Sequence, residues 1–401
     1  MVERRLWRLF KALDAKDIDV YLAAHTADIR WLTGFAGVFD EEQAHLALIV
    51  PGARAVSDMR DVGGEYEATF VALHLFTDTR YSAALRQLDA ENRWKIHDER
   101  RPRFSYVAET LATESLIDSL KAARKGKDAA PLRIGIESDL RLDSYRALCQ
   151  ALEERNDLNF ELVELSHLVS ELRSIKDAHE IEALKAAQSI TDRAFIHMLD
   201  YLKPGLTERE AASELEFFMR RAGADGVAFA SIVAGGPNSA IPHAIPGGRV
   251  FERGDFVLMD FGARLNDYRS DMTRTVALGR ASEQQKAMYA AVLAAQTAVI
   301  ETLAPNMSGL EAQNIADTVI AEHGFEGKFI HSLGHGVGID IHELPVLAPK
   351  VKTRLEVGQV VTVEPGVYID GVGGVRIEDY GVVTEHGFED FTQSPKELLI
   401  V

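Results

Sequence analysis

The first 170 residues alternate between short apolar runs and amphipathic stretches. Five runs rich in aliphatic and β-branched residues are typical of strands, at residues 17–24, 44–50, 70–76, 132–139 and 160–168. Between the last two runs, residues 143–155 predict a helix. Strands that alternate with helices indicate an α/β layer. The charged, small-residue segment 123–131 is predicted to be a solvated loop.

A second pattern begins near Ser174 and continues to the C-terminus. Residues 177–202 carry apolar side chains on one face, so they predict a long helix that ends before the Lys-Pro-Gly that follows. Three more helices are predicted from capping boxes, in which two side chains satisfy backbone donors of the first turn: Thr207 with Glu210, Ser282 with Gln285, and Ser308 with Glu311. Gly324 is predicted to end the last of them. We therefore expect two domains, at residues 1–170 and 171–401.

Two hairpins that each carry two acids are predicted in the second half, at residues 255–278 and 359–383. If the turn of the first hairpin centres on residues 266–267, Asp260 lies opposite Thr273, and Asp271 shares the same face of the ribbon. The second hairpin repeats this pattern with its own two acids, Glu364 and Glu378. Because each hairpin follows helices, the second half is predicted to be internally duplicated.

Composition and charge restrict the class of protein. The chain has 401 residues, 46% of them hydrophobic, and a formal net charge of −18. This charge argues against nucleic-acid or anionic-membrane partners, which require clustered Lys and Arg. The single cysteine, Cys149, cannot form an internal disulfide, and no run of about 18 apolar residues could span a membrane. We therefore expect a cytoplasmic protein.

Acids within apolar strands require compensation, because burying an ionised carboxylate costs several kcal/mol at least. For one such acid, a role in a turn or a hydrogen-bond network is the commoner explanation. Four acids in two matched hairpins instead favour two divalent ions, and an oxygen-rich site with one nitrogen ligand suits Mn, Co or Zn. Residues 331–345 offer three histidines for that ligand, and the pattern alone does not choose among His331, His335 and His342.

Seven residues in their local contexts resemble the pita-bread metallopeptidases, the superfamily of methionine aminopeptidase, aminopeptidase P, prolidase and creatinase. They are His243 in IPHAIPG, Asp260 in MDFG, Asp271 in SDMTRT, His335 and His342 in GHGVGIDIHELP, Glu364 in VEPGVY, and Glu378 in VRIED. IRWLTGF at 29–35 and LFTDTRY at 75–81 resemble the N-terminal domain of the prolidase branch. The resemblance implies an α+β chain, with a pita-bread fold of pseudo-twofold symmetry after a smaller α/β domain.

The resemblance also implies a dinuclear metal site. Asp260 would chelate one ion, Asp271 and Glu378 would bridge both, and His335 with Glu364 would complete the second. A water or hydroxide between the ions would be the nucleophile, and Glu364 would accept its proton. Among the possible metals the resemblance favours Mn, with Co or Zn as alternatives.

For the substrate, the resemblance implies a small peptide with proline at its second position. His243 and His342 would hydrogen-bond the scissile carbonyl, and His331 with Tyr368 would line the proline pocket. Arg376 matches an arginine near the substrate's C-terminal side, where it could pair with a carboxylate. The expected assembly is a homodimer.

These expectations favour a metal-dependent Xaa-Pro dipeptidase, or prolidase, because the HELP sequence at 342–345 is closer to the prolidase form. The first alternative is an aminopeptidase P that acts on longer peptides. The second is an enzyme of the same fold that acts on a non-peptide molecule such as ectoine. The third is a non-catalytic binding module, against which the complete set of ligands counts.

Overall fold

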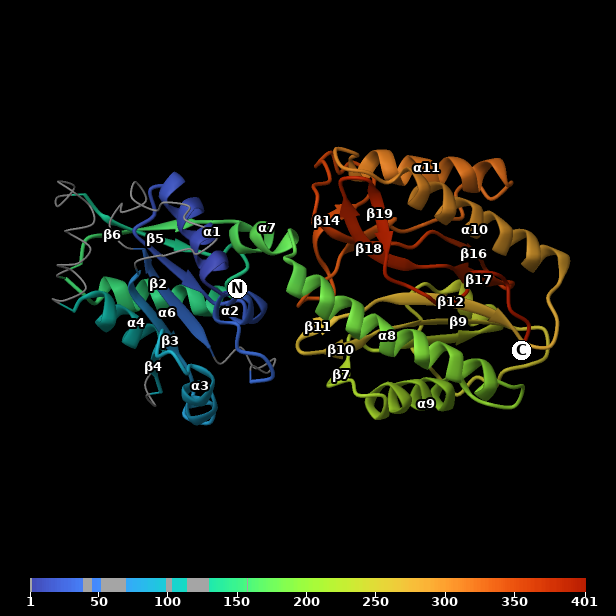
Figure 1. The fold of residues 1–401 in the computed structure, drawn as a ribbon, viewed down its shortest axis with the longest axis horizontal. Helices are drawn as coiled ribbons and strands as arrows, with labels where there is room; N and C mark the ends of the chain where they lie inside the picture. The colour runs from blue at the N-terminus through green and yellow to red at the C-terminus, as the bar shows by residue number, and fades with distance from the viewer. Residues whose placement is uncertain (1, 39–44, 52–69, 99–102, 114–129, 157) are drawn as a thin grey trace. The chain divides into compact units, whose positions relative to one another are not determined.

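The computed structural model describes residues 2–38, 45–51, 70–98, 103–113, 130–156 and 158–401. The chain separates into two compact units, Met1–Arg173 and Ser174–Val401 (Figure 1). The loop predicted at 123–131 falls almost wholly outside the described residues.

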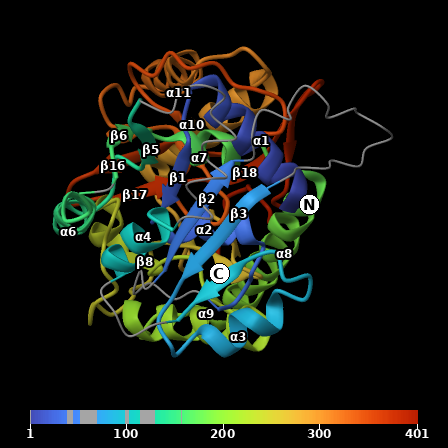
Figure 2. The same cartoon turned by 90° about the vertical axis from the view of Figure 1, so that its left-hand side faces the viewer.

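The first unit is built on a six-stranded sheet of order β4-β3-β2-β1-β5-β6. Figure 2, in which this sheet faces the viewer, shows β1, β2 and β3 side by side. The strands are β1 (Val20–Ala23), β2 (Leu46–Pro51), β3 (Phe70–Phe76), β4 (Lys95–His97), β5 (Leu132–Ile136) and β6 (Phe160–Glu164). All five predicted strands are confirmed. The sixth, β4, was missed because three residues are too few to show a periodic pattern.

The described part of this unit also contains helices. They are α1 (Val2–Ala15), α2 (Thr26–Thr33), α3 (Ser82–Leu88), α4 (Arg103–Leu111), α6 (Leu142–Glu153) and α7 (Leu168–Ser174). The core joins β1 and β5 to α4 and α6, through side chains such as Ile134, Val107 and Leu148. The helix predicted at 143–155 is therefore confirmed as α6, and the α/β character of this half with it.

A buried pair of histidines links β3 to β4 in the first unit. His74 Nδ1 lies 2.7 Å from His97 Nε2, and His97 Nδ1 lies 3.0 Å from the hydroxyl of Tyr106. Burial lowers the pKa of both imidazoles to about 4. Both rings are therefore neutral near pH 7.

The second unit contains the helices α8 (Ala178–Tyr201), α9 (Glu208–Arg221), α10 (Glu283–Thr302) and α11 (Gly309–Glu322). The three predicted capping boxes are confirmed at the starts of α9, α10 and α11. A fourth, formed by Asp177 and Glu180, begins α8. Gly324 has φ +84° just after α11, as expected of a residue that ends a helix.

Two sheets of the second unit are each covered by their own pair of helices (Figure 1). The first has the order β12-β9-β8 and packs with α8 and α9; the second has the order β14-β13-β15-β18-β19 and packs with α10 and α11. The strands are β8 (Ile232–Gly235), β9 (Phe256–Phe261), β12 (Met272–Ala277), β13 (Gly334–Gly336), β14 (Glu343–Leu347), β15 (Val360–Val363), β18 (Asp379–Thr384) and β19 (Gly387–Asp390). This repetition confirms the predicted duplication.

Shorter elements complete the unit. A three-stranded sheet joins β7 (Gly226–Val227), β10 (Ala263–Leu265) and β11 (Tyr268–Arg269), while β16 (Gly366–Ile369) pairs with β17 (Gly373–Arg376). A 3-10 helix, η2 (Gly236–Ala240), follows β8.

The register of the first hairpin places its acids as predicted. Asp260 on β9 lies opposite Thr273 on β12. The turn residues Asn266 and Asp267 have φ of 50° and 69°, and two successive positive φ angles are typical of the two-residue turn that matches strand twist. Asp271, the residue just before β12, therefore shares a face with Asp260.

The second hairpin contains two strand pairs, β15 with β18 and β16 with β17, and both follow the same register. Val363 lies opposite Asp379 and Gly366 lies opposite Arg376, so the intervening Glu364 and Glu378 face each other. A single β-bridge between Thr273 and Glu378 then connects the two hairpins. This bridge brings the acids of both repeats to one place.

Candidate active site

A cleft of about 540 Å³ in the second unit gathers the predicted site residues. All of them except Tyr368 line it: His243, Asp260, Asp271, His331, His335, His342, Glu364, Arg376 and Glu378. The remaining wall is largely apolar, with Phe229, Ile232, Ile341 and Val346. Residues from both duplicated halves therefore form one site.

The imidazole of His335 on β13 lies among the carboxylates. Its Nε2 atom is 3.5 Å from Asp271 Oδ2 and 3.5 Å from Glu364 Oε1. Donor atoms of Asp271, His335 and Glu378 all lie within 4.8 Å of one another. His335 Nδ1 is 3.0 Å from the carbonyl oxygen of Gly336 and must donate to it, which leaves the Nε2 lone pair directed at the acids. Burial lowers the pKa of His335 to about 4, so the ring is neutral and suited to bind a cation.

Raised pKa values at three of the carboxylates and a buried oxygen of the fourth indicate a cation site. Burial, followed by the charges of neighbouring acids, raises the pKa of both Asp271 and Glu378 well above the usual range. Burial also raises the pKa of Glu364 to about 8, against the opposing charge of Arg376. Asp260 Oδ1 is buried, and among the described residues it has no hydrogen-bond partner. This donor set, four hard oxygen ligands with one imidazole, fits a pair of divalent ions.

A chain of hydrogen bonds runs behind one wall of the cleft. The buried guanidinium of Arg376 pairs with Asp260 Oδ2 and donates to Thr273 Oγ1 at 3.0 Å and to the Tyr368 hydroxyl at 2.8 Å. The Tyr368 hydroxyl lies 2.8 Å from His331 Nε2. His331 Nδ1 donates to a backbone carbonyl 2.9 Å away, so Nε2 must accept from Tyr368. The chain holds the His331 ring on the cleft wall.

Two further histidines lie on the exposed side of the cleft. His243 follows η2, and His342 immediately precedes β14. The His342 ring packs edge-on against His335, with 4.4 Å between ring centroids. Both imidazoles can therefore reach a molecule that occupies the cleft.

Sequence reasoning missed two groups that hold the site residues. Thr362 Oγ1 accepts from the His335 backbone N–H at 3.0 Å and donates to Glu364 Oε1 at 3.2 Å. Lys176 Nζ lies 2.5 Å from Glu343 Oε1, beside His342, and both side chains are buried. No local signal marks the Lys176 partner, because the two residues are 167 positions apart.

Comparison with known proteins identifies both units. Residues 5–175 match the creatinase/prolidase N-terminal domain, and residues 182–385 match metallopeptidase family M24. The chain belongs to metallopeptidase family M24. It is therefore a metallopeptidase with the pita-bread fold, and the family implies divalent metal ions, in agreement with the donor set described above.

Relatives of this M24 chain include both types of Xaa-Pro enzyme. The Xaa-Pro dipeptidase of Pyrococcus furiosus is 40% identical over 266 residues, which cover 66% of this chain and 75% of that protein. The structure of an Xaa-Pro dipeptidase from Bacillus anthracis aligns over all of both chains with a TM-score of 0.84 and 36% identity. The X-Pro aminopeptidase of Thermotoga maritima aligns over 98% of this chain and all of its own, with a TM-score of 0.78 and 29% identity.

A membrane-spanning helix is absent from the described residues. Within them, none of the helices combines the length and the apolar character needed to cross a bilayer.

Proposed function

We propose that this M24 chain is a dinuclear-metal-dependent Xaa-Pro dipeptidase that hydrolyses the bond preceding proline. One observation carries the proposal: the four hairpin acids and His335 line the same cleft as the wall formed by His331. The names of the Pyrococcus furiosus and Bacillus anthracis relatives support the same substrate class.

The carboxylates and the imidazole divide the metal ligation between them. Asp260 would be a ligand of one ion, Asp271 and Glu378 would be ligands of both, and His335 and Glu364 would be ligands of the other. The 3.5 Å distances from His335 Nε2 to Asp271 and Glu364 support this division. When bound, the two ions would supply a water of lowered pKa and polarise the scissile carbonyl.

Three side chains of the cleft move or stabilise charge during hydrolysis. Glu364 accepts the proton of the attacking water and passes it to the proline nitrogen as the bond breaks. Its bond to Thr362 keeps the carboxylate in place for both transfers. His243 and His342 hydrogen-bond the oxygen of the scissile carbonyl, where negative charge develops. Their exposure to the cleft supports this role.

The wall of the cleft that carries His331 recognises the proline ring in this proposal. A bond to proline is a tertiary amide with no N–H, so the enzyme must recognise the ring instead of a backbone donor. The rigid His331 ring, held by Tyr368, is suited to pack against a pyrrolidine. Arg376 is the candidate partner for a substrate carboxylate, which would compete with Asp260 for the guanidinium.

The proposal also includes the identity of the metal, the assembly of the enzyme and its location. The metal is Mn, with Co or Zn as alternatives, because each accepts this ligand set. The enzyme acts as a homodimer. It works in the reducing cytoplasm, in keeping with a single cysteine and an acidic net charge.

A substrate panel tests the function. The Mn-loaded protein is incubated with Ala-Pro, Ala-Pro-Ala, Ala-Ala and ectoine, and product release is measured. We expect turnover of Ala-Pro and none of Ala-Ala. Turnover of Ala-Pro-Ala without Ala-Pro would change the assignment to an aminopeptidase P, and turnover of ectoine alone would change it to a non-peptide hydrolase. The dipeptidase proposal fails if neither proline peptide is cleaved.

A further inference from the structure

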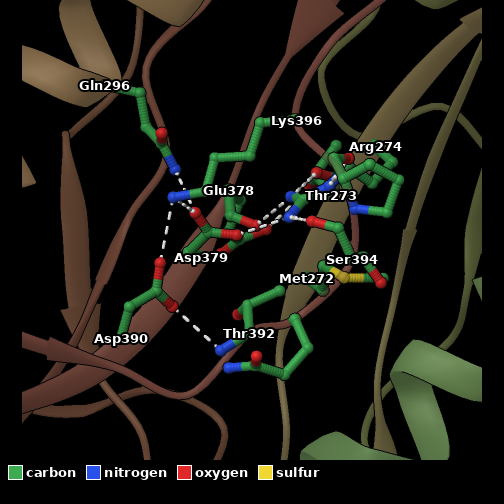
Figure 3. Close-up of polar contacts among 12 residues, drawn as sticks. Met272, Thr273, Arg274, Gln296, Glu378, Asp379, Asp390, Thr392, Ser394 and Lys396 are labelled. Carbon is green, nitrogen blue, oxygen red and sulfur yellow. Dashed lines mark hydrogen bonds and ion pairs between the residues drawn. The ribbon is translucent and has the colours of Figure 1, made fainter. Parts of the chain in front are cut away.

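A cluster of buried and partly buried charges lies behind Glu378, outside the set of residues that line the cleft (Figure 3). We call it the Arg274 cluster; it consists of Arg274, Asp379, Asp390 and Lys396. Arg274 and Asp379 are almost completely buried. The cluster contains two cations and two anions, so its formal charge is balanced.

Arg274 uses all five of its N–H donors. Nη1 donates to the carbonyl oxygens of Thr273 at 2.9 Å and Glu378 at 2.8 Å. Nη2 donates to Asp379 Oδ1 at 2.6 Å, and the remaining two donors bond carbonyls of residues 394 and 395, each at 2.9 Å. Only a guanidinium offers five donors in one rigid plane, so lysine cannot reproduce this arrangement.

Asp379 connects Arg274 to the C-terminal segment. Its second carboxylate oxygen accepts from Gln296 Nε2 at 2.6 Å and pairs with Lys396 Nζ. Lys396 also donates to Asp390 Oδ2 at 2.9 Å. Figure 3 shows these side chains converging on Asp379 from separate parts of the chain. The segment 394–396 is thereby attached to the strand that follows Glu378.

The cluster lies where the two duplicated halves must be held at a fixed separation. Arg274 is three residues after Asp271, and Asp379 is the residue after Glu378. Arg274 bonds the backbone on both sides of the Thr273–Glu378 bridge. Thr273 Oγ1 also donates to Glu378 Oε2 at 2.7 Å. Movement of Arg274 would therefore change the distance between the Asp271 and Glu378 carboxylates.

Stability alone does not explain a buried ionic cluster. Desolvation offsets most of the Coulomb attraction of a buried pair, and packed apolar residues often stabilise a protein equally well. What a bonded guanidinium adds is a defined geometry, and the ligands of a metal pair depend on such geometry.

We propose that Arg274, Asp379 and Lys396 are positioning residues that set the spacing of Asp271 and Glu378, so that the C-terminal segment 394–396 supports the metal centre. The inference rests on the proposed function, in which these two acids bridge the ions. None of the three residues contacts substrate in this proposal; each acts through Glu378 or its neighbouring strand.

Mn affinity tests the inference, with titration calorimetry and the absorption spectrum of the Co-loaded protein as readouts. Arg274→Lys keeps the charge but loses the bonds across the bridge, so we expect Mn binding weaker by about 10- to 100-fold and a changed Co spectrum. Lys396→Met should weaken Mn binding in the same direction, and Lys396→Arg should restore it. Parent affinity and a parent spectrum in both Arg274→Lys and Lys396→Met would overturn the inference.

Two controls separate this inference from a general loss of structure. Lys185→Met removes an exposed pair with Glu389 on the neighbouring β19 and should keep the parent Mn affinity. If Arg274→Lys does not fold, Lys396→Met carries the test, because Lys396 is partly exposed. A parent protein that binds no Mn would overturn the proposed function, and this inference with it. Mn binding that needs Asp271 but not Arg274 or Lys396 would overturn this inference alone.

Discussion

His335 presents its Nε2 lone pair to Asp271 Oδ2 at 3.5 Å, although the two residues come from different halves of the duplicated unit. The imidazole is neutral because burial lowers its pKa, while the pKa of the acid is raised mainly by burial. A cation bound between the two side chains would therefore stabilise them more than their direct contact does.

Replacement of Asp271 tests this relationship. We expect Asp271→Ala to lose Mn binding and peptidase activity together, because a bridging ligand is missing. The metal-free variant should be at least as stable as the metal-free parent, since one of several crowded buried acids has gone. Calorimetric Mn titration and thermal unfolding with a chelator measure both effects. Full activity in Asp271→Ala would refute the site assignment.

Metal removal should lower the stability of the parent protein. A ligand that binds only the folded state at 100 times its Kd stabilises it by about 2.7 kcal/mol. We expect EDTA to lower the Tm, added Mn to restore it, and Asp271→Ala to respond to neither. An equal Tm of the parent with EDTA and with Mn would contradict a metal site in the folded chain.

The buried pair of Lys176 and Glu343 should matter for stability and catalysis. Lys176→Met removes the buried ammonium that pairs with Glu343, and we expect this loss to cost about 3–5 kcal/mol. Because Glu343 adjoins His342, we also expect a lower kcat with little change in Mn affinity.

The matched control for this pair is Lys286→Met, which removes an exposed bond to Glu283. Its cost should be about 0–1 kcal/mol in a denaturant titration. The double variant Lys176→Met/Glu343→Leu should recover most of the stability without recovering kcat. Equal losses in the free energy of unfolding for Lys176→Met and Lys286→Met would show that burial does not strengthen the Lys176–Glu343 pair.

The histidine pair of the first unit predicts a dependence of stability on pH. The unfolded chain protonates these residues below about pH 6.5, whereas folded His74 and His97 do so only near pH 4. The contribution of these two histidines to the free energy of unfolding is fully present above pH 6.5. It should therefore be lost as the pH drops from 6.5 toward 4. Thermal unfolding across this range should show a shallower slope for His74→Gln/His97→Gln than for the parent.

Gly334 allows β13 to lie close to β15, because it has no Cβ. A Cβ at this position would overlap the carbonyl and hydroxyl oxygens of Thr362, which holds both His335 and Glu364. We expect Gly334→Ala to cost about 1–3 kcal/mol through overpacking and to weaken Mn binding. Gly248→Ala, where a Cβ meets open space, should change neither quantity. Calorimetry and thermal unfolding of both variants measure the difference.

Much of the fold could be predicted from the sequence because the relevant signals are local. Alternation and helical spacing identify elements, and side chains three residues apart identify helix starts such as Ser308. The Asn266-Asp267 turn set the register that placed Asp260 opposite Thr273, since a two-residue turn and a buried face leave little freedom to slip. The resemblance of the acid-bearing motifs then indicated the family.

Only the tertiary structure decided how these local pieces meet. The Thr273–Glu378 bridge, the bonds of Arg274 to Glu378 and Asp379, and the Lys176–Glu343 pair each join residues more than 100 positions apart. Spacing alone did not choose among the three histidines; the family resemblance indicated His335, and the structure places its Nε2 atom beside Asp271 and Glu364. Periodicity describes which face of an element is buried, but packing decides which residue it is buried against.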